Sequence, residues 1–136
     1  MQYDLDRPLD RFGEPSLADM VQTAIEILNK DEDGYFLFVE GGRIDHAHHS
    51  NNAIRAMQDT VALSDAVQRA MDLTDEDDTL IVLTADHSHV FTMAGYSRID
   101  TEIMGDQTVT VALIIILQLI HFKNIILFQD SILIRK

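Results

Sequence analysis

Histidine and carboxylate side chains in two short clusters are the residues of this chain that could do chemistry. The first cluster contains Asp45, His46, His48 and His49, and the second contains Asp86, His87 and His89. Asp45 precedes His49 by four residues, so the two side chains would share one face of a helix. Imidazole nitrogen combined with carboxylate oxygen suits zinc, whereas carboxylate oxygen alone suits magnesium. The spacing therefore predicts a divalent metal site.

A further carboxylate could reach the same place through a bend in the chain. Glu40 is followed by Gly41 and Gly42, whose backbone freedom would let the chain turn and aim the Glu40 carboxylate into the same cavity. The chain has no cysteine, which excludes thiolate zinc sites, disulfides and a cysteine nucleophile. Histidines and acids also gather in solvated loops that bind no metal, and the residue types alone leave both interpretations open.

The elements that would position these clusters follow from hydrophobic periodicity. Apolar residues recur at helical spacing from Leu17, just after Pro15, and this pattern predicts a helix over 17–30. A second helix is predicted over 51–73, which contains neither glycine nor proline. The short apolar runs 35–39 and 79–84 predict strands that are buried on both faces.

The order strand, helix, strand predicts the fold class. A crossover of this kind between neighbouring strands makes them parallel, and parallel strands bring their carboxyl ends to one edge of the sheet. The predicted class is α/β, a part of a mostly parallel sheet flanked by helices. Glu40 and the pair Asp86 and His87 would then face one crevice, and this placement favours a metal site over a solvated loop.

Charge and composition limit the possible partners. Ten Lys and Arg against 23 Asp and Glu give a net charge of −13, a field that repels phosphate backbones and argues against nucleic acid as a partner. With 46% hydrophobic and 24% charged residues, the chain has the composition of at most one globular domain. Gln2, Tyr3 and Asp4 follow Met1 where a secretory signal would carry basic and then apolar residues, so no targeting signal is expected.

Residues 107–136 differ in composition from the rest of the chain. Nearly all acidic residues precede Gln107, and 109–120 is an almost continuous aliphatic run. A bilayer span needs about 20 apolar residues, and this run is shorter. The charged residue Lys123 follows soon after it. We expect an aggregation-prone or strand-like tail rather than a membrane span.

Two motifs identify a family resemblance. The segment 38–49, Phe-Val-Glu-Gly-Gly-Arg-Ile-Asp-His-Ala-His-His, and the segment 83–91, Leu-Thr-Ala-Asp-His-Ser-His-Val-Phe, closely resemble alkaline phosphatases of the animal type. The resemblance extends from about Met1 to about Tyr96 and includes the run Glu-Pro-Ser-Leu at 14–17. It divides the chain into a partial alkaline phosphatase-like domain over 1–106 and an unrelated hydrophobic tail over 107–136.

The resemblance implies phosphomonoester hydrolysis at a site of two zinc ions and one magnesium ion. Glu40 matches a magnesium ligand, Asp45 and His49 match ligands of the zinc that activates the attacking water, and Asp86 and His87 match ligands of the zinc that activates a serine nucleophile. His46 and His89 match positions beside the metals rather than ligands, and Glu14 stands where the family has an aspartate of a calcium site.

Other parts of the family's site have no match here. The nucleophilic serine and an aspartate that bridges magnesium to zinc would precede Met1, and the last zinc-ligand histidine would follow far beyond Tyr96. No catalytic residue is therefore assigned, and the chain is expected to be incomplete. Ser88 lies beside a metal motif, where a structural hydrogen bond is expected rather than nucleophilic attack.

The resemblance also carries expectations about partners and location. Small phosphomonoesters would be the substrates, the full-length protein would be a homodimer, and it would lie at the cell surface or outside the cell on a lipid anchor whose segment has no counterpart here. Two alternatives stay open. One is an inactive metal-binding or partner-binding fragment, and the other is a related metal-dependent phosphodiesterase or sulfatase.

Overall fold

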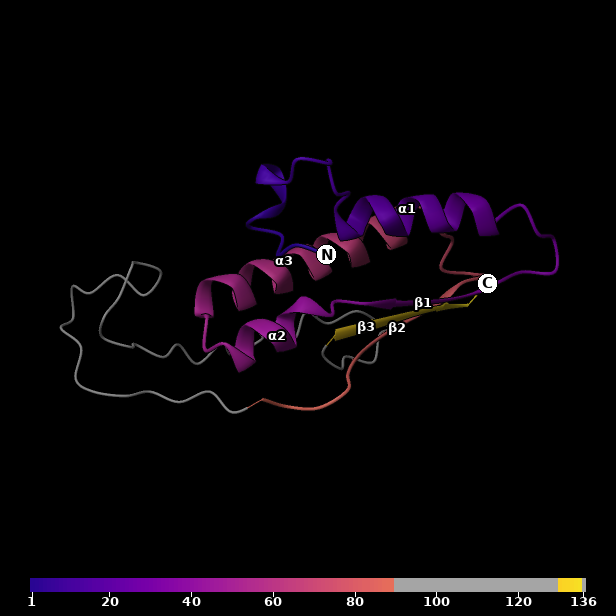
Figure 1. Cartoon of the computed structure of the whole chain (residues 1–136). Helices are drawn as coiled ribbons and strands as arrows, with labels where there is room; N and C mark the ends of the chain where they lie inside the picture. Colours follow the sequence, from indigo (N-terminus) through magenta and orange to yellow (C-terminus); the bar gives the residue numbers. More distant parts are fainter. Residues whose placement is uncertain (90–129, 136) are drawn as a thin grey trace.

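A computed structural model describes residues 1–89 and 130–135 of the chain, which form helices packed on one face of a small sheet (Figure 1). The elements in chain order are a short 3-10 helix η1 (Arg7–Leu9), α1 (Leu17–Leu28), β1 (Phe36–Glu40), α2 (Arg43–His49), α3 (Ala53–Asp72), β2 (Leu80–Ala85) and β3 (Asp130–Arg135). Helices α1 and α3 lie side by side over the sheet, and α2 continues from the end of β1.

The two predicted helices are confirmed, and side-chain caps explain where they begin. The Ser16 hydroxyl accepts a hydrogen bond from the Asp19 amide at 3.1 Å, and the Asp19 carboxylate accepts one from the Ser16 amide at 3.1 Å. This reciprocal pair satisfies two amides at the start of α1. At the start of α3, the Asn52 side chain accepts from the Arg55 amide at 3.1 Å.

The sheet corrects the prediction that β1 and β2 are parallel neighbours. The strand order is β1-β3-β2, and β3 is antiparallel to both of its partners. Strands β1 and β2 therefore run in the same direction but lie on either side of β3. Each would otherwise present an unpaired row of amides and carbonyls to the gap, and one antiparallel strand satisfies both rows.

The central strand comes from the segment that was expected to be a strand-like tail. Residues 130–135 have that strand character, whereas the aliphatic run 109–120 lies outside the described residues. The prediction that both faces of the strands are buried is wrong. Phe36, Phe38 and Leu80 are 64%, 60% and 50% exposed, because the described helices cover only the opposite face.

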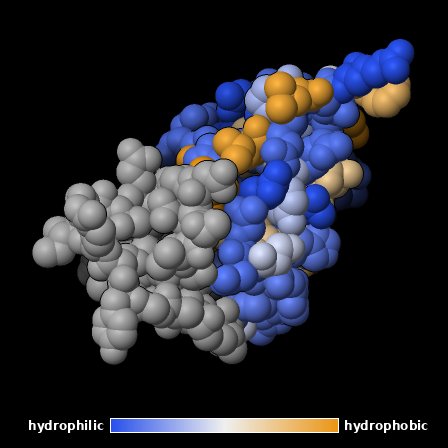
Figure 2. Space-filling view, turned by 60° about the vertical axis from the view of Figure 1, so that its left-hand side comes forward, coloured by the Kyte–Doolittle hydropathy of each residue, from blue (hydrophilic) through white to orange (hydrophobic). Residues whose placement is uncertain are grey.

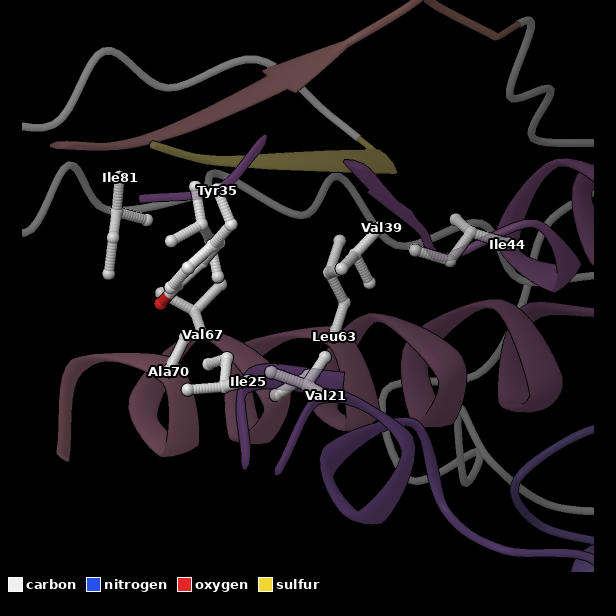
Figure 3. Close-up of a cluster of buried hydrophobic side chains, with 11 residues drawn as sticks. Val21, Ile25, Tyr35, Val39, Ile44, Leu63, Val67, Ala70 and Ile81 are labelled. Atoms are coloured by element: carbon white, nitrogen blue, oxygen red, sulfur yellow. The ribbon is translucent and has the colours of Figure 1, made fainter. Parts of the chain in front are cut away.

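The core lies between the sheet and the two long helices (Figure 3). Tyr35, Val39 and Ile81 point from the sheet side toward α3. Buried side chains from α1, from α3 and from the sheet fill this space, among them Val21, Ile25, Leu63, Val67 and Ile134. This packing fixes the ends of β1 and β2, from which the residues of interest extend.

On the face that Figure 2 shows, the coloured part of the surface is mostly hydrophilic, and hydrophobic side chains form only small groups there. Among the described residues, no helix combines the length and apolar character that crossing a bilayer requires.

Candidate metal centre

Helix α2 presents one acid and one histidine of the first cluster together. Ile44 and Ala47 are fully buried, and they fix the helix with its opposite side turned outward. Asp45 and His49 then lie one turn apart, and the Asp45 Oδ2 and His49 Nε2 atoms are 3.4 Å apart. The sequence prediction that these two side chains share a helix face is confirmed.

The second cluster meets the first at the Asp45 carboxylate. The Nε2 atoms of His87 and His89 lie 3.7 Å and 3.8 Å from Asp45 Oδ1, and His87 Nε2 lies 3.4 Å from Asp86 Oδ2. The rings of His49 and His89 meet edge to face, with centroids 4.6 Å apart. One carboxylate therefore faces three imidazoles that come from two separate parts of the chain.

This arrangement fits a metal ion. Asp45, His49 and His89 each offer a ligand atom, and these atoms all lie within 4.8 Å of one another. Two ligand atoms bound to one tetrahedral zinc at about 2.1 Å are about 3.4 Å apart, so the observed separations are close to those of a ligand set. Asp45 Oδ1 is also buried without a hydrogen-bond partner, as expected for an oxygen whose partner would be a cation.

A backbone contact orients one of the imidazoles for metal binding. His87 Nδ1 lies 3.1 Å from the carbonyl oxygen of Ser88, and a carbonyl can only accept, so Nδ1 carries the proton. The neutral ring then has its lone pair on Nε2, which is the atom that faces Asp45 and Asp86. Such an outer hydrogen bond is the usual means of fixing the tautomer of a metal-binding histidine.

His48 lies behind this group, beside His89 at a ring centroid distance of 5.2 Å. Its burial, and then the neighbouring His89, lower the pKa of His48 below the ordinary value. The neutral ring is therefore favoured, which keeps a further positive charge away from a site that would hold a cation.

Glu40, Glu14 and His46 are not among the three residues whose ligand atoms lie within 4.8 Å of one another. Glu40 is exposed at the end of β1 and lines a separate hollow together with Glu14 and the amino terminus. Glu14 accepts a hydrogen bond from the Gln2 amide at 2.9 Å and lies 3.7 Å from the terminal amine. The side chain of His46 is exposed, and its Nδ1 atom lies 3.3 Å from an Arg43 nitrogen.

Sequence reasoning placed His89 beside the metals rather than among the ligands, whereas the structure places it in the group of three possible ligands. A signal was present in the sequence. Residues two apart in an extended segment point to the same side, so the spacing of His87 and His89 after β2 would direct both rings toward the same place.

Comparisons with known proteins agree on one family. The sequence model of the family described as "Alkaline phosphatase" matches residues 1–118. Over 105 residues, or 77% of this chain, the sequence is 50% identical to the tissue-nonspecific alkaline phosphatase of Homo sapiens and 48% identical to that of Rattus norvegicus. It is 48% identical, again over 77% of the chain, to the membrane-bound alkaline phosphatase of Bombyx mori. The chain spans about a fifth of the length of these relatives, which is 20%, 20% and 19% in the three cases.

Proposed function

Because the chain belongs to the alkaline phosphatase family, we propose that it supplies part of the metal centre of a phosphomonoester hydrolase. The observation that carries this proposal is the Asp45 carboxylate, which lies 3.4 to 3.8 Å from the Nε2 atoms of three histidines. An ordinary surface ion pair would give this carboxylate a single charged partner. A carboxylate that faces three imidazoles has the composition of a zinc ligand set.

The residues of this chain would hold zinc in two overlapping ways. Asp45, His49 and His89 form one group of ligand atoms. Asp86 and His87 form a second pair, which meets the first group where His87 Nε2 lies 3.7 Å from Asp45 Oδ1. When bound, zinc would supply Lewis-acid activation of a water and of a phosphoryl oxygen. The chain's own contribution is to direct the Nε2 atoms at the centre, through contacts such as that of His87 Nδ1 with the Ser88 carbonyl oxygen.

The magnesium and calcium assignments belong to the same proposal but depend on different groups. Glu40 would be the magnesium ligand, and Glu14 would stand at the calcium position. Both offer carboxylate oxygen without imidazole, which is the donor type that these cations prefer. The hollow that they line also contains Asp4 and Asp59, together with Arg7 and Arg43, so a cation there would compete with two arginine side chains for these carboxylates.

We also propose that the full protein acts on small phosphomonoesters as a dimer at the cell surface or outside the cell. Support for the location comes from the membrane-bound name of the Bombyx mori relative. The related phosphodiesterase or sulfatase activity has no such support, since the relatives named above are alkaline phosphatases.

Calorimetric titration of the whole chain with zinc tests the proposal. Wild type is expected to bind zinc in a saturable manner, and Asp45→Asn is expected to bind it at least about tenfold more weakly, since it removes the shared carboxylate. Asp65→Asn is the matched control, because it removes the same charge from an exposed position on α3. Equal affinity for all three proteins would leave only attraction by the net charge of −13 and would refute the site.

The isolated chain is expected to hydrolyse an aryl phosphate no faster than zinc and magnesium alone. Covalent catalysis requires an activated nucleophile aligned with the metals, and the family resemblance assigns that role to no residue of this chain. The result separates metal binding from turnover. Hydrolysis that is lost in His87→Ala and that leaves a phosphoserine would instead show that a serine of this chain acts as the nucleophile, and Ser88 is the first to test.

A further inference from the structure

Strands β1 and β2 run in the same direction and are separated by the width of one strand, and β3 fills the gap between them. All five residues of β1 and all six residues of β2 pair in register with β3. Removing β3 would leave β1 and β2 about 10 Å apart, twice the spacing of neighbouring strands, with both inner edges unpaired. The gap thus has the width and the hydrogen-bonding groups to accept one extended peptide segment.

Side chains in the gap select an aliphatic residue at one defined position. Ile134 lies opposite Leu37 of β1 and Ile81 of β2, and directly opposite residues share one face of a sheet. Ile134 is fully buried and belongs to the core formed with the helices. The next residue, Arg135, lies opposite the exposed Phe36 and Leu80 and is itself exposed. The gap therefore distinguishes the two faces of an incoming strand.

The strand that fills the gap is separate from the family part of the chain. Both walls, β1 and β2, lie inside residues 1–118, which match the family, whereas β3 lies beyond that match. Of the described helices and strands, β3 alone lies outside residues 1–118. The gap is thus formed by the family segment, but its occupant comes from sequence outside it.

We propose that the gap between β1 and β2 is a strand-binding site, which takes an extended aliphatic segment antiparallel to both walls and is occupied in this chain by its own residues 130–135. Binding of this kind is β-augmentation, in which backbone hydrogen bonds supply affinity and alternate side chains supply specificity. The inference is independent of the metal centre, since it rests on the ladders and on the burial of Ile134.

A displaced strand and a labelled peptide test the proposal in the full-length chain. Ile134→Asp places a charge in the core and is expected to expel β3. A fluorescent peptide with the sequence of residues 129–136 should then bind this variant in a saturable manner. Binding to wild type should be at least about tenfold weaker, because the site is already filled. Arg135→Asp is the matched control, since it adds an acid at the exposed neighbouring position and should bind the peptide no better than wild type.

The proposal is overturned if the peptide binds wild type and Ile134→Asp equally, or if it fails to bind a variant that remains folded. Should Ile134→Asp unfold, refolding it with excess peptide must restore its helical circular dichroism, and failure to do so also overturns the proposal. Amide hydrogen exchange of wild type gives a second check, since β1, β2 and β3 should be protected together. A wild-type dimer that Ile134→Asp converts to monomer would show that the strand comes from a second copy and would refute occupation within one chain.

Discussion

Replacing Ile44 by alanine is expected to weaken both the fold and the metal centre, because this side chain anchors α2. Ile44 is 0% exposed and directly precedes Asp45. The substitution removes three carbon atoms, and at about 0.8 kcal/mol for each the transfer term is about 2.4 kcal/mol. The cavity that remains raises the expected loss to about 3–4 kcal/mol. That is a large share of the 5–15 kcal/mol or so that stabilises a typical domain.

Urea unfolding followed by circular dichroism measures this loss. The matched control is Ile27→Ala on α1, where the side chain is 57% exposed and the unfolding free energy should change by no more than about 0.5 kcal/mol. The zinc affinity of Ile44→Ala should also fall in the absence of urea, because a helix of seven residues cannot hold Asp45 and His49 in place without its packing. A loss of unfolding free energy below about 1 kcal/mol would refute the anchoring role.

A neighbouring glycine gives an independent test of the same packing. A Cβ atom added at Gly41 would lie 3.2 Å from Ile44 Cδ1 and 3.4 Å from a Leu63 methyl carbon. Gly41→Ala should therefore cost more unfolding free energy in wild type than in Ile44→Ala, where the tighter contact is gone. An equal cost in both backgrounds would mean that the tip of Ile44 does not pack against this turn.

Three further predictions concern the surroundings of the core. Asn52→Ala should lower the unfolding free energy by about 1 kcal/mol through loss of the cap on α3, and an unchanged urea midpoint would contradict this. Burial raises the pKa of the Asp59 carboxyl above its ordinary value of 3.8, so the folded state holds its proton more tightly, and the contribution of Asp59 to stability should fall as pH rises from 3.8 through the folded pKa. Asp59→Asn should remove that fall in urea titrations, and an identical pH profile would count against it. Arg55→Met, which breaks the 2.9 Å and 3.2 Å contacts with Asp6, should lower the melting temperature at low salt, and the difference should shrink in high salt.

The local elements of this protein could be predicted from its sequence because their causes are local. Apolar spacing predicts α1 and α3, and the short apolar runs predict β1 and β2. The spacing of Asp45 and His49 likewise fixes their shared helix face, since the helical period alone determines it.

Strand order and the membership of the histidine group were decided by tertiary structure. The sequence of β1 does not say which strand will pair with either of its edges. Residues 130–135 take that place because β1 and β2, which are distant in sequence, lie one strand's width apart. The glycines after Glu40 permit a bend without fixing its direction, and the structure places that carboxylate in the hollow with Glu14. His89 reaches Asp45 because packing brings the end of β2 beside α2. Local sequence thus determined which segments form and what they carry, whereas contacts between segments far apart in the chain determined which of those side chains meet.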